Sequence, residues 1–148
     1  MDFPQFNKYI IEFTARMIGD GFWMPVFLIN ETIDDVYQQE QYITIQQNEQ
    51  PMSDDTHIYD RGYLAGTMVP EDKNYPYHAQ IEIQNIDGMY KPYHSKGYFR
   101  IENFLYGIEF DIVGHFLKTE PITRLDLGVN YPSAFFGAGT VVTLYGVK

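Results

Sequence analysis

The chain carries four histidines, the side chains most often used as metal ligands and as acid–base groups near neutral pH. They stand singly, at His57, His78, His94 and His115, without the paired spacing on one element that a metal site needs. Because isolated histidines are usually solvated or hydrogen-bonded within a core, we expect none of them to bind a metal.

An acidic cluster lies between positions 54 and 60. Asp54, Asp55, His57 and Asp60 could place several ligand atoms around a calcium ion. The cluster lacks the alternating oxygen ligands and the glycine of an EF-hand loop. A solvated acidic loop is therefore the favoured interpretation, and no metal or other cofactor is predicted.

Catalytic chemistry has little support in the sequence. Serine occurs only at positions 53, 95 and 133, outside any GxSxG motif, and the chain has no cysteine to act as a thiolate. Acidic side chains are numerous, but those in the predicted strands occupy the polar positions of the alternating pattern. Charged residues at such positions face solvent and normally serve solubility. The acidic residues at these positions are Glu82, Glu102, Glu109 and Asp111. We expect a non-enzymatic protein with no catalytic residues.

Length and charge narrow the class of protein further. The 148 residues are 45% hydrophobic, which suits one domain spanning residues 1–148 with its own core. A formal net charge of -10 disfavours binding to nucleic acid or to an anionic membrane. The longest apolar run, residues 22–29, is far shorter than a membrane span, and the N-terminus lacks the features of a signal peptide. We expect synthesis in a cytoplasm.

Alternation of apolar and polar residues predicts strands, which must position any functional side chain. It is regular over residues 8–17, 77–86 and 107–113, with Ile81 and Ile83 among the core-facing positions. Residues 22–30 are apolar on both parities, which predicts a strand that is internal or at an interface. Pro25 removes one backbone donor and places that strand at an edge or a bulge.

The rest of the chain follows weaker patterns. We expect a loop or short helical turn over residues 31–40, a strand over 41–47, a loop over 48–61 and a short strand over 62–69. Residues 87–97 are predicted as a loop and residues 98–106 as a strand. About eight short strands without a long amphipathic helix indicate an all-β protein, an antiparallel β-sandwich of the jelly-roll type.

The last twenty-seven residues predict two strands that close one side of the sandwich. Leu125, Leu127 and Val129 alternate with polar residues, and residues 141–147 form a nearly continuous apolar run. Because the final strand is apolar on both parities, we expect one face in the core and the other partly against a neighbouring subunit. Cover by the chain's own loops is the alternative. The subunit-interface candidates are Val142, Leu144 and Trp23.

Five fragments occur in order in the C-terminal half. They are IEIQNID at 81–87, a lysine-containing loop at 91–96, PITRLDL at 121–127, FGAGT at 136–140 and TLYGVK at 143–148. In this order they resemble small phage-encoded jelly-roll (β-sandwich) proteins of virions, of the capsid-decoration or tail-appendage type. The resemblance covers roughly residues 77–148.

This resemblance implies a non-enzymatic virion component that is made in the host cytoplasm and is commonly a homotrimer. Its leading implication is a capsid decoration (cement) protein, whose partner is the major capsid protein or another virion protein. The alternative is a carbohydrate-binding module of a tail fibre or appendage that contacts host glycans.

Aromatic residues in two predicted loops are the candidate contacts with a partner or glycan. Loop tyrosines stack on sugar rings or act as hot spots at protein interfaces. If the two loops lie at the same end of the sandwich, they form one contact surface; alternatively, these residues pack over the end of the core. The candidates are Tyr90, Tyr93, Tyr131, Phe135 and Phe136.

Overall fold

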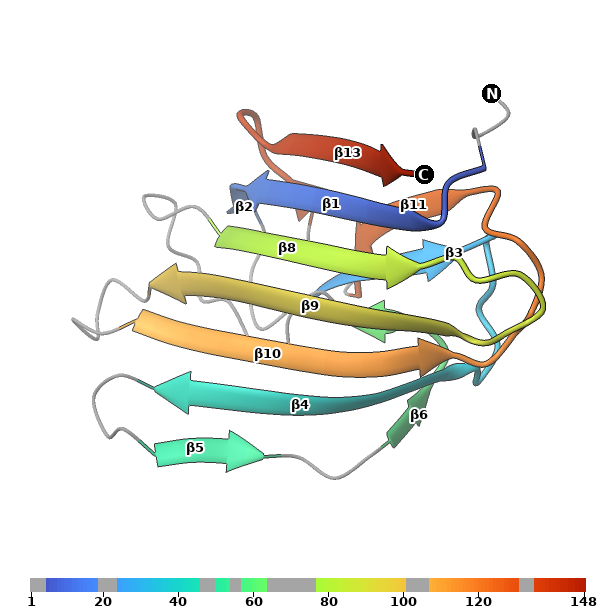
Figure 1. Ribbon diagram of the computed structural model, residues 1–148. Coiled ribbons are helices and arrows are strands. Elements are labelled where there is room, and N and C mark those ends of the chain that lie inside the picture. Colours follow the sequence, from blue (N-terminus) through green and yellow to red (C-terminus); the bar gives the residue numbers. More distant parts are fainter. Residues whose placement is uncertain are drawn as a thin grey trace.

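The computed structural model describes residues 5–18, 24–45, 50–53, 57–63, 77–100, 107–130 and 135–148. Within these ranges the regular structure is all β-strand, arranged in antiparallel sheets (Figure 1). The prediction of an all-β, antiparallel protein is confirmed, and two unequal sheets packed around one core are consistent with a β-sandwich.

The large sheet contains eight strands. Seven of them follow one another across the sheet, and β6 (His57–Tyr59) pairs with β4 beyond the end of β5. The seven, in spatial order, are β13 (Val141–Val147), β1 (Lys8–Ala15), β8 (Tyr77–Gln84), β9 (Lys91–Arg100), β10 (Gly107–Phe116), β4 (Tyr37–Ile45) and β5 (Gln50–Ser53).

The second sheet is much smaller. Its order is β11 (Leu125–Val129), β3 (Pro25–Ile29) and β7 (Gly62–Tyr63), and it lies behind the large sheet in Figure 1. A separate pair joins β12 (Phe135–Phe136) to β2 (Met17–Ile18). Because three short strands face a much wider sheet, they cover only part of it.

The core forms where the two sheets overlap. Alternate residues of β1 and β8 are buried, as the sequence pattern predicts, and they include Phe13 and Ile81. Phe27 of the small sheet contacts two tyrosines of the large one, with ring centroids 5.1 Å from Tyr93 and 6.0 Å from Tyr37. Aromatic edge-to-face contacts of this kind join the two layers.

Buried tyrosines serve as neutral hydrogen-bonding groups in this core. Burial raises the pKa of Tyr37 to about 12, and it raises the pKa of Tyr93 well above its usual range. The Tyr37 hydroxyl accepts a hydrogen bond from the Ile29 N–H (2.8 Å), and the Tyr93 hydroxyl donates to Gln39 Oε1 (2.8 Å). Each phenol therefore stays protonated and links strands of the fold.

Lys91 has a structural role at one end of the sandwich. Its side chain is fully buried, and its ammonium donates to the carbonyl oxygens of Ile86, Met89 (2.9 Å) and Thr119 (3.0 Å). These carbonyls belong to the β8–β9 turn and to the segment that leaves β10 for the small sheet. A buried cation needs such partners, so Lys91 holds the two segments together.

Two asparagines fix the same crossing segment. The Asn85 side-chain oxygen accepts from the N–H of Ile122, a core residue (3.1 Å). The Asn30 side-chain oxygen accepts from the N–H groups of Thr123 (2.8 Å) and Arg124 (3.0 Å). Asn30 itself has a positive φ of 52°, a conformation that asparagine tolerates better than most residues. The crossing from the large to the small sheet is thus anchored by side chains.

The expectation for Pro25 is wrong. β3 lies between β11 and β7 rather than at an edge, and no bulge is needed, because Pro25 is its first residue. Among the described residues, β7 pairs with Val26 and Phe27 and not with Pro25, so the missing N–H of Pro25 lies outside the described ladder between β3 and β7.

Three predicted loops contain strands. β4 begins at Tyr37, within the segment predicted as a loop or helical turn; β5 and β6 lie within residues 48–61; and β9 begins at Lys91. In β9 the core-facing positions 95 and 97 are serine and glycine, so the apolar alternation that marks a strand is absent. The short strand expected over residues 62–69 is β7 at its start, and residues 64–70 lie outside the described ranges.

The closing strands also differ from expectation. β11 and β13 are both present, but they belong to opposite sheets: β11 pairs with β3, and β13 pairs with β1. The last strand is therefore tied to the N-terminal strand along the edge of the large sheet.

We predict that Lys91→Met lowers the free energy of unfolding by about 2–4 kcal/mol, because it removes the three part-buried hydrogen bonds that the Lys91 ammonium donates to backbone carbonyl oxygens. The matched control is Lys96→Met on the same strand, whose exposed side chain makes no such contacts; it should change stability by less than about 0.5 kcal/mol. Urea unfolding monitored by circular dichroism provides the comparison. Equal stability of the two variants would contradict the structural role of Lys91.

Candidate functional surfaces

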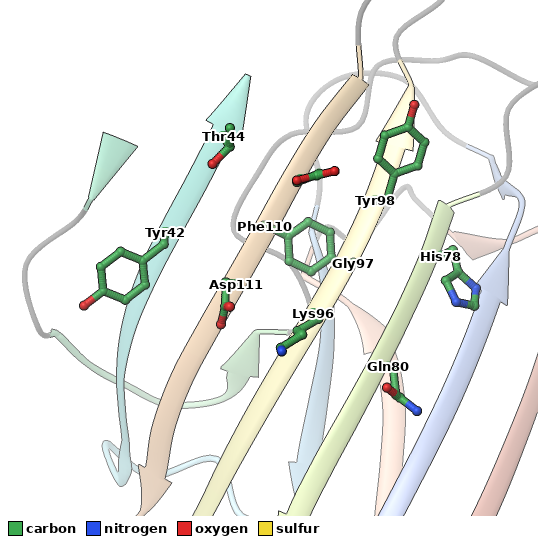
Figure 2. Close-up of a pocket in the computed structure, with 10 residues that line it drawn as sticks. Tyr42, Thr44, His78, Gln80, Lys96, Gly97, Tyr98, Phe110 and Asp111 are labelled. Carbon is green, nitrogen blue, oxygen red and sulfur yellow. The ribbon is translucent and has the colours of Figure 1, made fainter. Parts of the chain in front are cut away.

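The outer face of the large sheet presents a polar array. Alternate residues of β4, β8, β9 and β10 point away from the core, and Figure 2 shows them standing over these four strands. Strand register places Gln80 opposite Lys96, Lys96 opposite Asp111, and Asp111 opposite Tyr42. These four residues form one row across the sheet.

A second row runs beside the first. His78 is opposite Tyr98, Tyr98 is opposite Glu109, and Glu109 is opposite Thr44. The two rows line an open hollow of about 560 Å³, which we call the outer hollow. Its lining residues are Tyr42, Thr44, His78, Gln80, Lys96, Gly97, Tyr98, Glu109, Phe110 and Asp111 (Figure 2).

Gly97 forms part of the floor of the outer hollow. A Cβ atom at this position would overlap the ring of Phe110 and the backbone carbonyl oxygen of His78. The Phe110 ring therefore occupies the space that a side chain at position 97 would take. Glycine here lets an aromatic residue pack closely beneath the sheet.

Polar groups around the outer hollow are paired with one another. His94 Nε2 lies 2.5 Å from Asp111 Oδ1, and Thr14 Oγ1 lies 3.0 Å from His78 Nδ1. The Tyr42 hydroxyl donates to Glu40 (2.9 Å), and this hydrogen bond to a carboxylate raises the pKa of Tyr42. Tyr42 is therefore a neutral phenol at physiological pH, with its hydroxyl oriented by Glu40.

The second candidate surface is the exposed edge strand β13. Val141, Val142, Leu144, Tyr145 and Val147 are all exposed, and only Thr143 in this strand is partly buried. The expectation that one face of β13 lies in the core is wrong, because the small sheet does not extend over it. β1 pairs with one side of β13, and among the described strands none pairs with its other side, which is the edge of the large sheet.

Two of the three predicted interface candidates lie on β13. Val142 and Leu144 are 47% and 40% exposed, respectively, so both are accessible to another chain. Their role in an interface stays a prediction. Trp23, the third candidate, lies outside the described residues.

The predicted aromatic contacts are not brought together. Tyr90 is exposed in the β8–β9 turn, but Tyr93 is a buried residue of β9, so its placement in a contact loop is wrong. Phe136 packs against Phe13, with ring centroids 5.1 Å apart. Phe135 belongs to β12, but its side chain is not described, and Tyr131 lies outside the described residues.

Strand register also separates the two predicted loops. The β8–β9 turn adjoins the end of the large sheet where Lys8 pairs with Gln84 and Val147. Phe136 lies at the opposite end, where Phe13 is near Val141 and Val142. The described parts of the two loops therefore cannot form one contact surface.

The sequence pattern does not single out the exposed tyrosines of the outer hollow. Tyr42 and Tyr98 lie on predicted strands, where the polar parity indicates only solubility. Each tyrosine lies on the polar side of its predicted strand, which indicates an exposed side chain. Only the order of the strands in the sheet places the two on one surface.

Three of the four histidines, His78, His94 and His115, lie on the same outer face, on neighbouring strands. Among the residues that the structure describes, however, no group of three histidine, cysteine or acidic residues could hold a metal ion. Asp60 is paired with Arg61, and the remaining acids of the predicted calcium loop, Asp54 and Asp55, fall outside the described ranges.

The described part of the chain contains no helix that is long and apolar enough to cross a membrane. No protein-family model, curated protein or solved structure matches the chain. Two surfaces of the described residues are candidates for function, the polar outer hollow and the apolar edge strand β13.

We predict that Gly97→Ala destabilises the fold by about 1–3 kcal/mol, because the added methyl group forces Phe110 or β8 to move. Gly128→Ala is the matched control: a Cβ atom there has no neighbour within 4 Å, so its effect should stay below about 0.5 kcal/mol. Chemical unfolding of both variants measures the difference. If Gly97→Ala were as stable as Gly128→Ala, the close packing of Phe110 beneath Gly97 would be refuted.

Proposed function

We propose that this protein is a non-enzymatic structural component of a phage virion, a capsid decoration protein that docks through the edge strand β13. The observation that carries the proposal is the apolar, exposed character of β13 at the open edge of an eight-stranded sheet. An edge of this kind presents unpaired backbone groups and apolar side chains together, and soluble proteins normally protect such edges. A partner that pairs with β13 would satisfy both.

The partner is either a neighbouring copy in a homotrimer or the major capsid protein, as the virion resemblance implies. Trimers suit the three-fold positions of a capsid lattice, and closed symmetric oligomers are the common form of assembly. A decoration protein binds the assembled shell and not the free coat subunits. By mass action, this selective binding stabilises the shell. The net charge of -10 keeps the unbound protein soluble despite its apolar edge.

One part of the large sheet supports the jelly-roll part of this proposal. β8, β9 and β10 are consecutive neighbours, and β4, which precedes them in the chain, lies beside β10. β8, β9 and β10 form a meander, and β4 lies beside it after a long connection that contains β5, β6 and β7, so the arrangement resembles a Greek key with inserted strands.

The alternative function, a carbohydrate-binding module of a tail fibre or appendage, loses support at the predicted loops, because Tyr93 is buried and Tyr90 lies far from Phe136. Glycan binding is favoured instead by the outer hollow, which is a different surface.

The test of the proposed function is to label purified particles with an antibody to this protein and to count its copies by quantitative electrophoresis. Decoration predicts many copies distributed over the head. Labelling confined to the tail would contradict decoration and favour an appendage, and absence from particles would contradict both virion functions.

We predict that Leu144→Lys leaves the isolated protein folded but weakens its docking at least tenfold, because an unpaired charge is then placed in an apolar interface. The control is Ile33→Lys, an equivalent change at a residue that is 68% exposed and lies outside β13. Copies retained per particle and sedimentation equilibrium of the free protein are the measurements. Normal docking of Leu144→Lys, or an equal loss with Ile33→Lys, would contradict the assignment of β13.

A further inference from the structure

We propose that the outer hollow is a binding site for a neutral oligosaccharide. The first observation is that half of its lining residues carry polar groups that the fold does not pair. Within the described part of the chain, the side chains of Thr44, Gln80, Lys96, Tyr98 and Glu109 make no hydrogen bond or ion pair, whereas the polar groups around them are paired. The hollow therefore concentrates hydrogen-bonding capacity that the fold does not use.

The chemistry of these groups matches hydroxyl groups. The Lys96 ammonium only donates and the Glu109 carboxylate only accepts, while Gln80 and Thr44 do both. A sugar hydroxyl also donates and accepts, so it can bridge a donor and an acceptor on neighbouring strands. A phosphate or sulfate requires donors alone and would be repelled by Glu109 and Asp111.

Two exposed aromatic rings flank this polar centre. Tyr42 is 42% exposed on β4, and Tyr98 is 40% exposed on β9. β10 lies between these strands, so at the usual spacing their backbones are about 9.5 Å apart. Figure 2 shows the two tyrosines on either side of Asp111 and Phe110. Rings placed in this way can stack on two sugar units of one chain, while the unit between them lies over the carboxylates.

The sheet fixes the position of Tyr98. A Cβ atom at Gly107 would overlap the hydroxyl end of the Tyr98 ring, so that end lies directly over the glycine. A ring held against backbone loses little freedom when a ligand stacks on it, which favours binding. Tyr42 is held similarly, by its hydrogen bond to Glu40.

A peptide strand does not fit this surface. β9 and β10 are each paired on both sides, so their backbone groups are not available for strand addition. The lining is also mostly charged and polar, whereas the centre of a protein interface is depleted of charge. A neutral, hydroxyl-rich chain is the occupant that uses both the tyrosines and the free polar groups.

The site is tested by isothermal titration calorimetry of the full chain with a panel of neutral hexasaccharides: β-1,4-glucan, α-1,4-glucan and β-1,4-xylan oligomers. Alginate oligosaccharides of the same length serve as the anionic comparison. At least one neutral oligomer should bind at micromolar to millimolar concentration, and the anionic one should bind at least tenfold more weakly. Failure of all neutral oligomers to bind, or preference for alginate, would overturn the proposal.

Variants then locate the site. Tyr98→Ala and Tyr42→Ala should each reduce affinity about tenfold or more, because stacking is lost, and Tyr98→Phe should retain most of the affinity. Tyr90→Ala is the control, since it removes an exposed tyrosine of the β8–β9 turn. Unfolding curves establish that each variant is folded. Affinity that survives the Tyr42→Ala/Tyr98→Ala double variant, or that is lost in Tyr90→Ala, would overturn the assignment to the outer hollow.

This proposal is independent of where the protein resides on a virion. Saccharide binding would hold for a protein on the head or on the tail, and particle labelling does not depend on it. The two proposals therefore fail separately.

Discussion

The inequality of the two sheets is the physical constraint on which the rest of this structure depends. A sheet gains most of its stability by burying one face against another layer, and here three short strands face a sheet of eight. Tyr9, Phe13 and Ile81 are buried where the two layers overlap, whereas the side chains of β13 are exposed. The same feature that limits the core thus creates an apolar edge open to other molecules.

Such a small second layer must be held in place by more than apolar contact. Lys91, Asn85 and Asn30 bind the backbone of the segment that crosses from β10 to β11, and Tyr37 links β4 to Ile29 of β3. Each of these polar groups is satisfied at the junction between the sheets, so each specifies where the small sheet lies. Side chains on the outer face of the large sheet do not hold the small sheet in place. Lys96, Gln80 and Glu109 are therefore available for a ligand.

The extent to which the fold could be predicted follows from this arrangement. β1, β8 and β10 bury one face each, so their apolar alternation was a sufficient signal. The sequence predicts a strand only from residue 98, whereas β9 begins at Lys91, because Ser95 and Gly97 face the core without apolar side chains. The exposure of β13 could not be predicted from its own sequence, since an apolar strand at an uncovered edge has the same pattern as one inside a sandwich. Likewise, the proximity of Tyr42 and Tyr98 depends on strand order, which connects segments more than fifty residues apart in the chain.

The central claim is that β13 is a docking edge. Its most direct test is hydrogen–deuterium exchange of the 141–147 segment, measured in the free protein and on purified particles that carry it. The account predicts that β13 amides exchange faster than those of β8 in the free protein and become strongly protected on the particle. Unchanged exchange in β13, with new protection confined to other segments, would contradict it.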